Sequence, residues 1–69
     1  MANTTYKQIE ITGTSSTGME DAIESAVKRA SQTIRQMQWF EVTEVRGRID
    51  EDHVNQWQVT LKIGFALED

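Results

Sequence analysis

The chain has 69 residues and a net charge of −4 at pH 7, so it is long enough for one domain, residues 1–69, and no more. It contains no cysteine and one histidine, which excludes disulfides and a histidine-rich metal cluster as ways to stabilise so small a core. The acidic charge argues against a nucleic-acid partner. No apolar run has the length of a signal peptide or a membrane span, so we expect a cytoplasmic protein without a membrane partner. Self-association remains as the expected way to stabilise the fold.

The first predicted element is a short strand over Thr5–Gly13. Ile9 and Ile11 face one way and the polar residues between them face the other, which predicts one buried face. A cluster of turn-forming residues, "TSSTG", follows this strand.

The second predicted element is a helix over Met19–Met37. Thr17 and Glu20 have the spacing of a capping box, although Ser15 or Ser16 could cap the helix instead. Its apolar residues recur at spacings of three and four, and two of them are alanines that would let the helix lie close to a sheet. These residues are Met19, Ile23, Ala26, Val27, Ala30, Ile34 and Met37.

The last predicted element is a β-hairpin with arms Gln38–Ile49 and Val54–Leu67 and a charged connection, "DEDH". The second arm alternates without a break, which is the strongest strand signal in the chain. The order is therefore β-α-β-β, an α+β fold. The second arm is about 46 Å long and the helix about 28 Å, so the overhanging apolar residues need another surface. A second copy of the same chain in a symmetric assembly would supply it.

Two tryptophans occupy different positions in this pattern. Trp57 is in register with the apolar face of the second arm and is interpreted as a core or subunit-contact residue. Phe40 and Val42 are the expected core pair of the first arm, so Trp39 is expected to point away from the helix. There it either packs against a neighbouring chain or stacks on a planar ligand.

Arg46 and Gln58 are the polar candidates. In a regular strand Arg46 shares a face with Phe40 and Val42, and a bulge near Gly47 would turn it to the other face. It is either a solvated arginine at the sheet rim or an arginine whose guanidinium group binds phosphate or carboxylate. Gln58 is either plain surface or a side chain that donates and accepts at the edge of a heterocyclic ring.

Catalysis is not expected. The single histidine, His53, falls in the hairpin connection and is interpreted as a solvated turn residue. There is no nucleophile with a base at suggestive spacing, and no glycine-rich phosphate loop. We therefore do not expect an enzyme.

Nearly the whole chain resembles the dodecin family, in the ordered set "ITGTSS", "DAIESAVKRAS", "WFEVTEVRGRI" and "QVTLKIGFALE". The resemblance implies a three-stranded antiparallel sheet wrapped partly round one helix, and a hollow homododecamer of 23 symmetry. It also implies storage and photoprotective sequestration of flavin, FMN or riboflavin, as pairs stacked between symmetry-related tryptophans. Some members also hold coenzyme A.

Carried over by position, the resemblance places the stacking tryptophan at Trp39, the ring-edge glutamine at Gln58 and an arginine near the flavin phosphate at Arg46. Some bacterial relatives carry a further arginine where this chain has Ala66, which keeps riboflavin open as the ligand beside FMN. The alternative function is a self-assembling structural or adaptor module in which Trp39 anchors a subunit interface.

Overall fold

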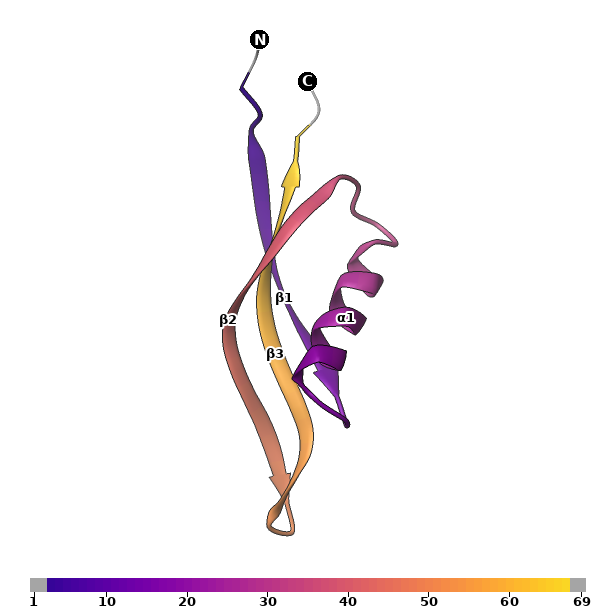
Figure 1. The fold of residues 1–69 in the computed structure, drawn as a ribbon, viewed down its shortest axis with the longest axis vertical. Helices are drawn as coiled ribbons and strands as arrows, with labels where there is room; N and C mark the ends of the chain where they lie inside the picture. Colours follow the sequence, from indigo (N-terminus) through magenta and orange to yellow (C-terminus); the bar gives the residue numbers. More distant parts are fainter. Residues whose placement is uncertain (1–2, 68–69) are drawn as a thin grey trace.

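The fold is that of a computed structural model, which describes residues 3–67. The elements are β1 (Tyr6–Ser15), α1 (Met19–Ala30), β2 (Met37–Asp50) and β3 (His53–Ala66). The three strands form one antiparallel sheet in the order β1-β3-β2, with α1 packed on one face (Figure 1). The predicted α+β class and β-α-β-β order are confirmed.

The core is centred on β3, the strand with the clearest alternation. Val59, Leu61 and Ile63 are at most 1% exposed. β3 pairs with β1 on one side and with β2 on the other, so its backbone is hydrogen-bonded along both edges. Alternation predicts strand and buried face correctly here because every second residue of a strand points to the same face.

The helix lies close to the sheet because its buried residues are small. Ala22, Ala26 and Ala30 recur every four residues and are all buried. Opposite them lies Gly13 of β1, where the helix comes close to the strand: a Cβ on Gly13 would lie 2.7 Å from the Cβ of Ala26 and closer still to the carbonyl oxygen of Ala22. The contact therefore depends on the absence of a side chain at Gly13.

We expect Gly13→Ala to lower the free energy of unfolding by about 2 kcal/mol or more, because the added methyl group forces α1 away from β1. Denaturant unfolding at fixed protomer concentration measures the effect. The matched control is Gly18→Ala, where a Cβ would meet nothing within 4 Å. Equal losses in the two variants would contradict this account of Gly13.

The helix is shorter than predicted: it ends at Ala30, not at Met37. Ser31 donates a hydrogen bond from Oγ to the carbonyl oxygen of Lys28 at 2.6 Å, which competes with continuation of the helix. Gln36 then takes a positive φ of 63°, which turns the chain into β2. Ile34 and Met37 keep the apolar spacing because they also pack against the core, from the connection and from β2.

The predicted capping box is wrong as well. Gly18 is the N-cap of α1 and makes no side-chain capping bond. Instead the Oγ of Ser15 accepts the backbone N–H of Thr17 at 2.9 Å and donates to Oδ2 of Asp21 at 2.7 Å. Ser15, one of the two alternative caps, thus ties the end of β1 to the first turn of the helix.

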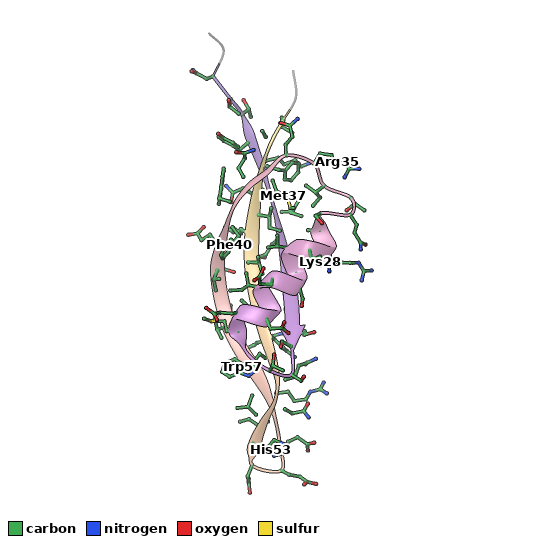
Figure 2. The ribbon with its side chains drawn as sticks, turned by 45° about the vertical axis from the view of Figure 1, so that its right-hand side comes forward. Lys28, Arg35, Met37, Phe40, His53 and Trp57 are labelled. Atoms are coloured by element: carbon green, nitrogen blue, oxygen red, sulfur yellow. The ribbon has the colours of Figure 1, made fainter. Side chains whose placement is uncertain are left out.

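The inner side of β2 is left uncovered. Phe40 and Val42 lie opposite Ile63 and Leu61 on the face that carries the helix, but α1 packs over β1 and β3 (Figure 2). The two side chains are 49% and 36% exposed, so the prediction that they form a core pair within one chain is wrong. The radius of gyration is 14.5 Å, against about 11 Å for a compact domain of this length. An extended chain with exposed apolar residues is typical of a subunit of an assembly.

A two-residue turn joins β2 to β3. Glu51 and Asp52 have φ values of 50° and 68°, the signs of a type I′ hairpin turn, which strongly favours Asn-Gly. The double variant Glu51→Asn, Asp52→Gly should therefore raise the free energy of unfolding by about 1 kcal/mol. A thermal midpoint that stays the same or falls would show that the native turn is not strained.

Candidate functional site

A β-bulge decides which side chains share the outer face, meaning the face of the sheet away from α1. β2 and β3 shift register between Val42 and Glu44, so Thr43 is the extra residue. The bulge reverses the alternation of β2, and Arg46 lies opposite Gln58 on the outer face. The prediction that Arg46 shares a face with Phe40 is wrong. A bulge does turn it round, but at Thr43 and not near Gly47.

Trp39 lies on the outer face, as predicted, where a glycine makes room for it. It is paired with Gly64, and a Cβ on Gly64 would lie within 2.5 Å of three atoms of the indole six-membered ring. Tyr6 of β1 meets the indole edge-on, with the ring centroids 4.8 Å apart and the planes at 70°. Trp39 is still 39% exposed, so part of a positioned aromatic ring remains open to a ligand or to another chain.

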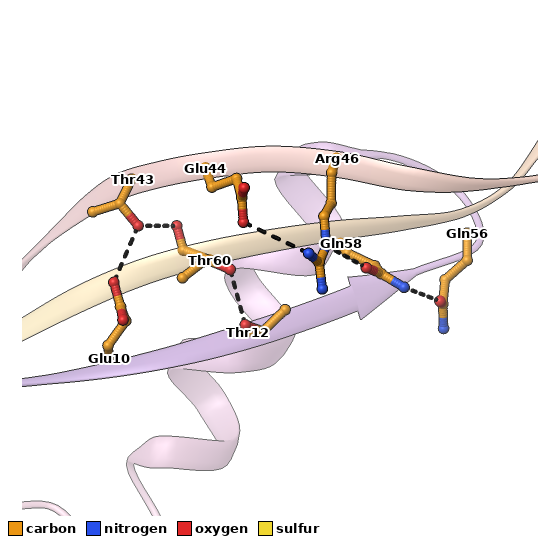
Figure 3. A network of polar contacts seen from close by, with 8 residues as sticks. All are labelled: Glu10, Thr12, Thr43, Glu44, Arg46, Gln56, Gln58 and Thr60. Atoms are coloured by element: carbon orange, nitrogen blue, oxygen red, sulfur yellow. Dashed lines mark hydrogen bonds and ion pairs between the residues drawn. The ribbon is translucent and has the colours of Figure 1, made fainter.

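Gln58 lies in a row of polar side chains further along β3. Its Oε1 accepts a hydrogen bond from Nε of Arg46 at 2.8 Å, and its Nε2 donates to Oε1 of Gln56 at 2.9 Å. The Nη1 of Arg46 is 4.0 Å from Oε1 of Glu44 (Figure 3). Both partners of this ion pair are more than half exposed, so it adds little stability. The shorter bond to Gln58 is the contact that orients the guanidinium.

A second polar group joins the three strands between Trp39 and Gln58. The hydroxyls of Thr12 and Thr60 are 2.9 Å apart across β1 and β3. Thr43, at the bulge, donates to the carbonyl oxygen of Thr60 at 3.2 Å (Figure 3). In the middle of the outer face, these two contacts therefore tie β1 and β2 to the central strand β3.

Trp39 and Gln58 lie too far apart to act on the same ring within one chain. Trp39 is paired with Gly64, and Gln58 lies six residues away on the same strand. At 3.3 Å per residue this is about 20 Å, longer than a three-ring heterocycle. The indole rests over Gly64, and the Gln58 amide is turned toward Gln56 and Arg46. A ligand that stacks on one and hydrogen-bonds to the other therefore needs residues from two chains.

The remaining candidates lie elsewhere. His53 is exposed at the hairpin turn, with Nδ1 3.3 Å from the carbonyl oxygen of Glu51 (Figure 2). Trp57 is half-buried and shares the inner face with Val59, as predicted. Within residues 3–67, no cluster of three or more His, Cys, Asp or Glu side chains is placed to hold a metal ion. In the same part of the chain, the one helix is too short and too polar to cross a membrane.

Three residues of this face were missed in the sequence. Gly64 interrupts the polar face of β3, and a glycine inside a strand can mark a close approach, which was the available signal. Tyr6 and Gln56 gave no signal. The contact of Tyr6 with Trp39 spans the whole width of the sheet, and Gln56 matters only through its bond to Gln58.

The larger hollows lie on the other side of the molecule. A groove of about 480 Å³ runs between β1 and α1, with Ile9, Ile11 and Ile34 among its walls. Another, of about 560 Å³, lies between α1 and β2, beside Ile23 and Phe40. The first groove has mixed polar and apolar walls, and the second is mainly apolar. Both are open to solvent, and surfaces of this kind are found where neighbouring subunits pack.

Comparison with known proteins gives consistent results. Residues 5–68 match the family model described as Dodecin. A curated dodecin from Thermus thermophilus is 50% identical over 64 residues, 93% of each chain. The solved structure of dodecin from Streptomyces coelicolor has a TM-score of 0.94 and 54% identity, covering 100% of this chain and 99% of that one. The calcium dodecin of Mycobacterium tuberculosis, described as having a novel calcium-binding site, is more distant. Its TM-score is 0.81 at 30% identity, covering 93% of this chain and 91% of that one.

Proposed function

The chain belongs to the dodecin family, and from that premise we propose that it binds and stores flavin, FMN or riboflavin, and shields it from light. Flavins would be held as stacked pairs between Trp39 side chains of two subunits, in a hollow homododecamer. The observation that carries the proposal is the positioned, partly open indole of Trp39 on the same face as Gln58 and Arg46.

Each residue would have a separate role. Trp39 would stack on the flavin ring. Gln58, from another chain, would hydrogen-bond to the pyrimidine edge, and Arg46 would approach the phosphate of FMN. Ala66 offers the phosphate no charge, which is why riboflavin is included as a ligand. Coenzyme A is proposed as a second ligand because some members of the family hold it. A cytoplasmic location is proposed because the sequence shows no apolar run of signal-peptide or membrane-span length.

The proposed role is binding and not turnover. An indole in contact with an excited flavin can donate an electron to it, which returns the flavin to its ground state without chemistry. A flavoenzyme needs access to the reactive face of the ring, and a stacked pair between two indoles would block that access. His53, the only histidine, lies at the hairpin turn, at the opposite end of β3 from Gly64 and the indole of Trp39.

The test of the proposal is a titration of apo-protein into FMN, riboflavin and lumichrome, followed by flavin fluorescence. Strong quenching at a fixed stoichiometry is expected, and the three titrations rank the ligands. A colourless oligomer that quenches none of the three would contradict flavin binding and favour the alternative, an assembly module with Trp39 as its interface anchor.

The two-chain site makes a prediction of its own. Trp39→Ala and Gln58→Ala assemblies, each impaired alone, should regain full-strength riboflavin sites when the two proteins are unfolded, mixed and refolded together. In a random mixture about a quarter of the sites would combine an intact Trp39 with an intact Gln58 from a neighbour. The control is the same protocol on each variant alone. If mixing restores no sites, both residues of a site come from one chain.

A further inference from the structure

The side-chain amide of Gln58 is held in one orientation by its two neighbours, Arg46 and Gln56. Arginine can only donate hydrogen bonds, so the oxygen of Gln58 has to face Nε of Arg46, at 2.8 Å. The nitrogen of Gln58 then faces Gln56, which has to present its own oxygen, at 2.9 Å. The hydrogen bonds from Arg46 to Gln58 and from Gln58 to Gln56 therefore fix the direction of the Gln58 amide.

The two bonds leave a defined set of free positions. An amide oxygen has two lone pairs and an amide nitrogen has two hydrogens. Arg46 uses one lone pair and Gln56 uses one hydrogen, so Gln58 keeps one acceptor and one donor. The free acceptor and the free donor match one N–H and the adjacent C=O of a pyrimidine edge. Arg46 and Gln56 determine which end of the amide faces the N–H and which faces the C=O.

We propose that Gln56 is a positioning residue, and that Arg46 acts on the ring edge through Gln58 as well as on a phosphate. The inference rests on the proposed flavin function and adds how the pyrimidine edge of the ring is recognised by hydrogen bonds. Gln56 and Gln58 are both half-buried on β3, so water competes less for the hydrogen bond between them than it would at a fully exposed pair. A pre-ordered amide loses less conformational freedom when the ligand binds.

The first test compares two changes at position 56. Gln56→Leu removes the acceptor, and riboflavin affinity should fall about fivefold, the size of one neutral hydrogen bond. Gln56→Glu keeps an acceptor at the same place and should stay within about twofold of the parent. Riboflavin is used because it is neutral. The control is Asn55→Leu, the same kind of change at the exposed neighbouring residue. Equal losses for Gln56→Leu and Gln56→Glu would overturn the proposal.

A second ligand separates positioning from a merely structural effect. N3-methylriboflavin lacks the N–H of the pyrimidine edge, so it should bind the parent less tightly than riboflavin does. In Gln56→Leu this penalty should shrink, because the contact that methylation breaks is already weakened. An unchanged penalty in Gln56→Leu would mean that Gln56 does not act on the ring edge.

Arg46 gives an independent measurement. Arg46→Met should weaken riboflavin by about fivefold or more, because the oxygen of Gln58 loses its donor. FMN should be weakened at least as much, because it also loses the contact to its phosphate. If only FMN binding falls, the arginine serves the phosphate alone and the positioning role is wrong. If the parent protein binds no flavin at all, the proposed function itself fails, and that result is distinct from every variant result above.

Discussion

Replacing Trp39 with alanine should weaken riboflavin binding about thirtyfold or more and restore the fluorescence of the flavin that still binds. A desolvated tryptophan at a contact contributes about 2 kcal/mol or more, which corresponds to that factor. The indole is also the proposed electron donor, so its removal should separate affinity from quenching. A titration at flavin concentrations that saturate the variant measures both quantities.

Trp57→Phe is the control, because Trp57 lies on the inner face and should not touch the flavin. It should leave both affinity and quenching unchanged. The assembly has to be checked by light scattering in both variants. If Trp39→Ala falls apart into smaller species and the parent never quenched flavin, Trp39 is an interface anchor. Full quenching in a flavin-saturated, intact Trp39→Ala assembly would rule out the indole as the quencher.

Gly64→Ala should affect flavin binding almost as strongly as the loss of Trp39, although it adds only one methyl group. The new Cβ would overlap with three ring atoms of Trp39, so the indole has to leave its place. If the indole is displaced from its place between Gly64 and Tyr6, it can no longer stack on the flavin ring in the position that the rest of the site requires. We expect riboflavin affinity to fall about tenfold or more, with tryptophan emission shifted in the apo-protein.

The matched control for Gly64→Ala is Gly18→Ala, where the same methyl group enters open space. It should bind riboflavin with the parent affinity. A double variant, Gly64→Ala with Trp39→Ala, tests the mechanism directly. If the methyl group acts only through the indole, the double variant should be no weaker than Trp39→Ala alone. Additive losses would place the effect of Gly64 somewhere other than the indole.

The sequence predicted most reliably what depends on local periodicity. The alternation of β3 predicted both its faces, because period two survives any twist of the strand. The end of α1 was predicted wrongly, since Ile34 and Met37 keep a helical spacing while they reach the same core from a connection and from β2. Periodicity reports which residues are apolar, and not which element carries them.

The outer face could be predicted only in part. Trp39 was placed correctly because the pairing is regular from Trp39 to Val42, so that Trp39 alternates with Phe40 as expected. Arg46 was placed wrongly because one extra residue, Thr43, reverses everything after it, and no side chain in the sequence marks that bulge. The exposure of Phe40 and Val42 depends on which strands the helix covers, a tertiary fact that the pattern of β2 does not contain.

The strand order has a consequence for biosynthesis. β3 is the central strand of the sheet but the last of the four elements to leave the ribosome, and it carries Val59, Leu61 and Ile63. Until it emerges, β1 and β2 have no strand to pair with and the helix has no core to cover. Many larger proteins fold their N-terminal parts during translation, and this sheet cannot do so. A nascent chain stalled before β3 would therefore expose its apolar residues in full, and quality control could recognise it as unfinished.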